Sequence, residues 1–141
     1  MSSLTLHAAT RFDLAEVYGP QPPHVWAAIS WQAERGLTFA FRDTAGVAQC
    51  VGGYVPSLEL GVWECWFHAG PQAAPHMLAF ARLARLTLDV VPQSDPRPIE
   101  AIVRTRAGGR LARAIGFRPV GAVGTVQVWR ARDGRLAGWA E

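Results

Sequence analysis

The middle of the chain is predicted to contain a strand, a long helix and a second strand in succession, which limits the folds that the chain can adopt. Residues 58–69 are the most strand-like segment, rich in aromatic side chains. A long helix is predicted from about His76 to Val91, where apolar residues recur at helical spacing. Residues 98–104 are then predicted to form a buried strand. Because such crossovers are right-handed and return to the same sheet, we expect the two strands to be parallel neighbours that diverge at their C-terminal ends.

The segments before and after this run supply further strands and helices. Two strands separated by residues 44–46 are expected to form a hairpin. Asp13 is a candidate N-cap of the first helix, and Pro22 and Pro23 can start the second. Gly52 and Gly53 lie inside a predicted strand and indicate a bulge or a close backbone approach. The strands are expected at 4–10, 37–43, 47–56 and, as one or two strands, 118–131, and the helices at 14–19, 24–35 and 106–115.

This order of elements predicts the fold class. Strands and helices that alternate in this way favour an α/β (α+β) fold, with a mixed central sheet of six to seven strands and helices on both faces. The length of 141 residues fits a single domain covering residues 1–141.

The helix at 106–115 has unusually clear boundaries. The hydroxyl of Thr105 can cap its first turn, and Gly116 can take the left-handed conformation that closes its last turn. One face is apolar, and the other carries three arginines, Arg106, Arg110 and Arg113.

Composition excludes several classes of protein. With 50% hydrophobic and 18% charged residues, the chain is not disordered. The formal charge is only +3 and is spread along the chain, so nucleic-acid binding ranks last among the possible functions. Cys50 and Cys65 are not in a CxxC pair, and no zinc-type spacing is present, so we expect neither a disulfide framework nor a metal site. No apolar run resembles a signal peptide or membrane span, which favours a cytoplasmic protein.

Two stretches of the sequence resemble the GNAT acyltransferase superfamily. Residues 5–17 are similar to its opening strand and first helix, and residues 104–121 to its closing helix and strand, where a Gly-Phe pair ends the helix. Together with the order of elements, the resemblance covers nearly the whole chain. It implies transfer of an acetyl group from acetyl-CoA to a primary amine, with an acyl-CoA and an amine as partners.

Two features that this family usually has are missing. The family's pyrophosphate loop is rich in glycine, and its backbone amides bind the phosphates of coenzyme A. Here the matching loop, residues 68–78, has only Gly70 as a glycine, and two of its residues are prolines without an amide proton. The family often has a tyrosine in its closing helix as the acid for the leaving thiolate, and the matching residue is Ala112. We therefore expect weak coenzyme A binding.

These departures leave a second function open. A GNAT-fold module that has lost catalysis could serve as a binding or structural component, for instance in a viral or prophage particle. The expected partners therefore include a second copy of the chain in a homodimer, or the subunits of a larger particle.

The resemblance also implies candidate site residues. Glu64 is the candidate general base, and its alternative role is an ion pair with an arginine near the sheet surface. His68 is the second candidate catalytic residue, and its alternative role is that of an ordinary histidine at the end of the strand. It lies on the same strand face as Glu64, but four residues of strand separate the two by roughly 13 Å, so they form no direct dyad. The candidate cofactor-binding residues are Phe67, His68, Ala69, Gly70, Ala74, His76, Arg106 and Arg110.

The remaining candidates also have two interpretations each. His76 and the arginines of the last helix would contact phosphates, or else be solvated surface residues. Trp63 and Trp66 would pack on the two faces of the sheet, or one of them would line the acyl cleft. Cys65 shares a face with Trp63 and Phe67 and is expected to be a packing residue.

Overall fold

The structure, a computed structural model, describes residues 3–91, 95 and 97–132. Its strands are β1 (Thr5–Ala8), β2 (Leu37–Arg42), β3 (Ala48–Ser57), β4 (Val62–Ala69), β5 (Ile99–Val103), β6 (Arg118–Val123) and β7 (Val126–Arg132). Its helices are α1 (Arg11–Tyr18), α2 (Pro23–Arg35), α3 (Met77–Thr87) and α4 (Arg106–Ile115), and short 3-10 turns flank α3 at Ala74–His76 and Leu88–Val90.

The seven strands form one mixed sheet in the order β1-β2-β3-β4-β5-β7-β6. Strands β4 and β5 pair in parallel, and every other neighbouring pair in this order is antiparallel. The predicted mixed sheet, its strand number and the parallel pair from the central crossover are therefore confirmed.

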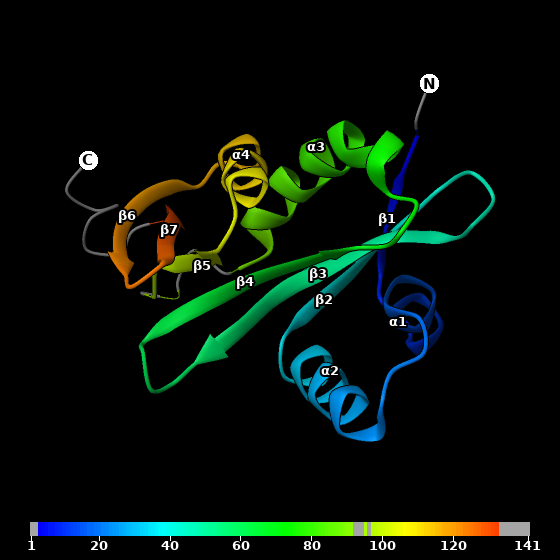
Figure 1. The fold of residues 1–141 in the computed structure, drawn as a ribbon, viewed down its shortest axis with the longest axis horizontal. Helices are drawn as coiled ribbons and strands as arrows, with labels where there is room; N and C mark the ends of the chain where they lie inside the picture. Colours follow the sequence, from blue (N-terminus) through cyan, green and yellow to red (C-terminus); the bar gives the residue numbers. More distant parts are fainter. Residues whose placement is uncertain (1–2, 92–94, 96, 133–141) are drawn as a thin grey trace.

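Helices cover both faces of the sheet, as predicted (Figure 1). Helices α3 and α4 lie on one face, over a core that includes Phe41, Phe80 and Ile99. Helices α1 and α2 lie on the other face, over a smaller core that includes Ile29 and Val51. Because α1 and α2 cover mainly β2 and β3, with α1 also reaching β4, they leave the part of this face near β5 largely uncovered.

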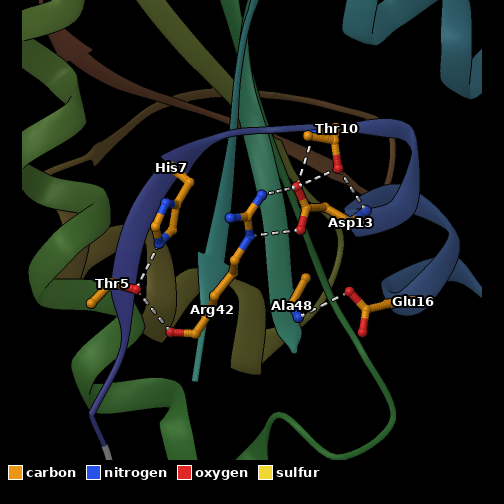
Figure 2. Close-up of polar contacts among 7 residues, drawn as sticks. All are labelled: Thr5, His7, Thr10, Asp13, Glu16, Arg42 and Ala48. Atoms are coloured by element: carbon orange, nitrogen blue, oxygen red, sulfur yellow. Dashed lines mark hydrogen bonds and ion pairs between the residues drawn. The ribbon is translucent and has the colours of Figure 1, made fainter. Parts of the chain in front are cut away.

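A buried ion pair fixes α1 to the sheet (Figure 2). Asp13 is only 2% exposed, and its carboxylate accepts bonds of 2.9 and 2.8 Å from the guanidinium of Arg42 on β2. The same carboxylate accepts the backbone amide of Thr10, whose hydroxyl accepts the amide of Asp13 in return. The N-cap is therefore Thr10, and the prediction that Asp13 caps the helix was wrong. Asp13 is instead the third helical residue of a capping box.

The start of β4 and the extent of α3 also differ from the prediction. Strand β4 begins at Val62 rather than residue 58, because residues 58–61 form the turn of the β3–β4 hairpin, closed by Gly61 at φ +65°. The α-helical part of the predicted helix at 76–91 is confined to α3, and its two ends tighten into 3-10 turns.

Gly52 and Gly53 mark a close approach and not a bulge. The pairing of β2 with β3 is regular through both residues, and its register shift lies at Phe41 and Arg42. A side chain on Gly53 would overlap the carbonyl oxygen of Leu37 on β2. Glycine at this position lets β2 and β3 keep their spacing.

Helix α4 has the predicted boundaries. The hydroxyl of Thr105 accepts the amide of Gly108 at 2.9 Å, and Gly116 ends the helix at φ +123°. The segment that follows forms two strands, β6 and β7, rather than one. No helix in the described part of the chain has the length and apolar character needed to cross a bilayer.

A candidate active-site cleft between β4 and β5

The sheet opens into a cleft where β4 and β5 separate. The parallel pairing runs from Trp63 opposite Ile99 to Cys65 opposite Ala101 and ends there, which confirms the predicted divergence. A cleft of about 470 Å³ lies at this point. Its lining comes from β4, β5, α4 and their neighbours, including Gln32, Glu64, Trp66, Phe67, Glu100, Ile102, Gly108, Leu111 and Ala112.

Backbone groups of β4 point into the opening. The amide of Trp63 donates to the carbonyl of Pro98 at 2.8 Å, so the peptide groups of Trp63 face β5. Alternate residues of a strand direct their backbone groups to the same side, and β4 pairs with β3 without a register shift. The amides and carbonyls of Phe67 and Ala69 therefore lie on the edge of β4 that β5 no longer pairs with, and Phe67 lines the cleft. They can pair with an extended ligand as a neighbouring strand would.

Glu64 lies on the open face of β4 and lines the cleft. It is directly opposite Glu100 on β5, with the two strands about 4.8 Å apart. Glu100 is bonded by the guanidinium of Arg130 on β7, with an Nε–carboxylate distance of 3.0 Å. Among the described residues Glu64 itself forms no ion pair. The ion pair expected as the alternative role of Glu64 thus belongs to its neighbour, and the Glu64 carboxylate is exposed to the cleft.

His68 is held away from the cleft by an aromatic contact. Its ring stacks on Tyr18 at the end of α1, with ring centroids 4.2 Å apart and planes 7° from parallel. Partial burial of the ring lowers the pKa of His68 from its ordinary value, which favours the neutral form. The cleft lining includes Glu64 but not His68. In this arrangement His68 joins the end of β4 to α1.

The loop that would bind the pyrophosphate is bonded mainly to itself. Three of its amides already have backbone acceptors: Gly70 donates to Gln49 at 2.8 Å, Ala73 to Gly70 at 3.2 Å and His76 to Ala73 at 2.8 Å. The amide of Met77, at the start of α3, donates to Ala74. A phosphate at this position would have to compete with these bonds.

Prolines further reduce the number of donors in the loop. Pro71 and Pro75 have no amide proton. Gln72 and the exposed Ala74 are then the loop residues whose amides have no backbone acceptor within the described chain. Of the predicted phosphate-binding positions, Ala74 keeps a free donor, whereas the amides of Gly70 and His76 are engaged.

Helix α4 presents two different faces to its surroundings. Gly108, Leu111 and Ala112 line the cleft. Arg106 and Arg110 line a second pocket on the other side of the helix, so the structure does not bring them together with Glu64. Ala112, which occupies the family's acid position, places only a methyl group at the cleft.

The apolar side chains of β4 between Trp63 and Phe67 pack in the core or line the cleft. Trp63 and Cys65 are buried under α3 and α4, and burial raises the pKa of the Cys65 thiol well above its ordinary value. Cys65 is therefore a packing residue, as predicted. Trp66 lies on the opposite face and contributes to the cleft, and the ring of Phe67 packs edge-on against Phe80 with centroids 5.1 Å apart.

Sequence reasoning missed two contributors to this site. The stacking of Tyr18 on His68 depends on how α1 crosses the sheet, which no local pattern shows. Glu100 had a visible signal, since it is a charged residue within a strand predicted to be buried. Across the described residues, no group of three or more His, Cys, Asp or Glu side chains could hold a metal ion.

The fold and the cleft together define a protein with the GNAT acyltransferase fold. Among 72 similar solved chains is a putative phosphinothricin N-acetyltransferase, with a TM-score of 0.68 and 15% identity over 94% of this chain and 99% of that one. A GCN5-related N-acetyltransferase from Kribbella flavida has a TM-score of 0.68 and 16% identity, covering 92% and 97%. A spermidine N-acetyltransferase from Vibrio cholerae has a TM-score of 0.64 and 12% identity, covering 98% of each chain.

The similarity lies in structure rather than in sequence. No protein-family model and no curated protein matches the chain. At these sequence identities the similarity establishes the fold alone and does not define the function.

Proposed function

We propose that the chain is an N-acyltransferase that moves an acetyl group from acetyl-CoA to a primary amine in the β4–β5 cleft. The observation that carries this proposal is the exposed carboxylate of Glu64 in a cleft that opens where β5 leaves β4 and that Phe67, further along β4, also lines. The structure neighbours named as N-acetyltransferases support this class of reaction.

Each group in the cleft has a role in the proposed reaction. The pantetheine arm pairs with the backbone of Phe67 and Ala69, which places the thioester carbonyl near amides that stabilise its developing negative charge. Glu64, directly or through a water, takes a proton from the amine, whose nitrogen attacks the carbonyl carbon. The carbon–sulfur bond then breaks and releases the thiolate of coenzyme A. Since Ala112 cannot act as an acid, the thiolate takes its proton from water.

The loop before α3 favours a second function. Its prolines and its internal hydrogen bonds leave few amides for a pyrophosphate, which is the pattern expected if cofactor binding has been lost. In that case the chain would be a binding or structural module with the GNAT fold, for instance within a viral or prophage particle. A homodimer or a larger assembly would then be its working form.

Replacement of Glu64 by glutamine separates these functions. If the chain is an acyltransferase, Glu64→Gln lowers kcat by about 10²-fold or more and leaves the KM for acetyl-CoA nearly unchanged, because glutamine keeps the shape but not the basicity. The assay follows release of free coenzyme A with a panel of primary amines. Glu59→Gln, the same change in the exposed β3–β4 turn, is the matched control and should retain full activity.

Two results would reject the proposal. Full activity of Glu64→Gln would remove Glu64 from the mechanism. Absence of turnover in the parent protein across the amine panel would favour the module without catalysis.

A further inference from the structure

A second pocket lies on the far side of α4 from the cleft. Its volume is about 460 Å³, and it is formed by the end of β5, the outer face of α4 and the start of β7. Four arginines surround it, Arg104, Arg106, Arg110 and Arg113, and none of its lining residues is acidic. We call it the arginine pocket.

The spacing of the helical arginines directs them to one face. Arg106 and Arg110 are four residues apart and Arg110 and Arg113 three apart, so all three lie along the same side of α4. Like charges at these spacings destabilise a helix. Within the described part of the chain none of the four arginines has an ion-pair partner, so nothing there offsets this repulsion.

The floor of the arginine pocket includes a buried aromatic ring. Trp129 is 5% exposed, and its indole N–H donates to the side-chain oxygen of Gln127 at 3.1 Å. The guanidinium carbon of Arg113 lies 5.4 Å from the centroid of this indole, within the range of a cation–π contact. Glycine at position 109 lets α4 lie close to Trp129, because a side chain there would press on the indole ring. Arg113 is thereby positioned before any ligand binds.

We propose that the arginine pocket binds a small anion carrying two or more closely spaced phosphates. Guanidinium groups match the geometry of phosphate oxygens and bind them in pairs of parallel hydrogen bonds. Two or three linked phosphates carry more negative charge than one phosphate and therefore balance more of the positive charge of the four arginines. Arg104 lines both this pocket and the β4–β5 cleft, whereas Arg106, Arg110 and Arg113 line the arginine pocket and not the cleft. The inference therefore concerns a site formed mainly by residues that the proposed acyl transfer does not use.

The gathering of the arginines at one pocket favours a small ligand over a nucleic acid. Nucleic-acid surfaces distribute basic residues along a stripe that follows successive phosphates. Here the four arginines surround one pocket, and the formal charge of the whole chain is only +3.

The test is calorimetric titration of the full chain with tripolyphosphate at low ionic strength. We expect the parent to bind, and Arg110→Gln to bind about tenfold more weakly or worse, since one charge-assisted hydrogen bond contributes about that factor. Arg85→Gln removes an exposed arginine from α3, outside the pocket, and should leave the affinity within about twofold, as expected for the loss of a distant, screened charge. The melting temperature of each variant checks that it is folded.

Parallel titrations distinguish the source of the phosphates and the site. Tighter binding of ATP than of tripolyphosphate would indicate that the ligand is a nucleoside triphosphate. Equal binding of the two would indicate that the pocket recognises the polyphosphate alone, and both results support the proposal. Orthophosphate should bind much more weakly, and acetyl-CoA should bind Arg110→Gln as it binds the parent.

Several results would overturn the proposal. Failure of the parent to bind tripolyphosphate at millimolar concentration, or binding of orthophosphate as tight as that of tripolyphosphate, would contradict the proposal. So would a loss of tripolyphosphate affinity in Arg85→Gln equal to that in Arg110→Gln, or a loss of acetyl-CoA binding in Arg110→Gln. Affinity for single-stranded DNA that exceeds that for tripolyphosphate and rises with length would assign the surface to nucleic acid instead.

Discussion

Replacement of Asp13 by asparagine should destabilise the protein strongly, although the two side chains have nearly the same shape. The carboxylate is buried and accepts two hydrogen bonds from Arg42 and one from the amide of Thr10. Asparagine can keep the bond to Thr10 but loses the charge, which leaves Arg42, whose side chain is 25% exposed, without its charged partner.

The expected loss can be worked from the contacts. Breaking a fully buried ion pair costs about 3–5 kcal/mol, and a hydrogen bond to a charged group contributes about 1.5–3 kcal/mol. Because the Arg42 side chain is 25% exposed and water can solvate part of it, we expect about 2–3 kcal/mol. For a chain of this length that corresponds to a fall in melting temperature of roughly 6–15 °C.

The pH dependence of stability gives a second readout of the same pair. Burial alone would raise the pKa of Asp13, but the bonds from Arg42 and Thr10 outweigh it and hold the pKa below its ordinary value of 3.8. A depressed carboxylate pKa stabilises the fold above the unfolded pKa, and this contribution is lost as the pH falls below about 4 through the folded pKa. The parent should therefore lose more stability in acid than Asp13→Asn does.

Urea unfolding of Asp13→Asn, Arg42→Gln and the double variant measures the coupling between the two residues. We expect the double variant to be less destabilised than the sum of the two single changes. Additive effects of the two changes would contradict a coupled ion pair between Asp13 and Arg42. So would a loss of unfolding free energy below about 0.5 kcal/mol in Asp13→Asn, a value typical of an exposed pair.

Two other predictions concern local features. Gly53→Ala should destabilise the sheet strongly, because its methyl group would overlap the Leu37 carbonyl, whereas Gly121→Ala on β6, where nothing lies within 4 Å, should be nearly neutral in thermal unfolding. Since burial lowers the folded pKa of His68, part of the stability present above pH 6.5 should be lost as the pH falls through and below that value. His68→Phe, followed by urea unfolding between pH 7 and 5, should lose less stability over this range than the parent. The same pH dependence in both proteins would show that His68 does not contribute to it.

The sequence predicted the parts of the fold that depend on local patterns. Helix α4 has a capping threonine, a terminating glycine and a strong amphipathic pattern, so its boundaries were predicted correctly. The parallel pairing of β4 with β5 followed from the handedness of crossovers. The cap of α1 was misplaced because Thr10 and Asp13 are both capping residues, and the bonds between them and Arg42 decide which one is the N-cap.

The candidate site was less predictable, because it depends on which residues face one another. The ion pair of Glu100 with Arg130 joins residues 30 positions apart, and only the strand order brings them together. The position of Arg110 on the outer side of α4 follows from the orientation of the helix on the sheet, which periodicity alone does not fix.

Titration of the protein with acetyl-CoA tests whether the β4–β5 cleft is the site of an acyltransferase. We expect binding to the β4–β5 cleft with a dissociation constant well above one micromolar, since losing two loop amides weakens binding by a factor of about a hundred or more. An absence of binding at millimolar acetyl-CoA would contradict the proposed acyltransferase, and a submicromolar dissociation constant would contradict the weak binding expected from the loop before α3.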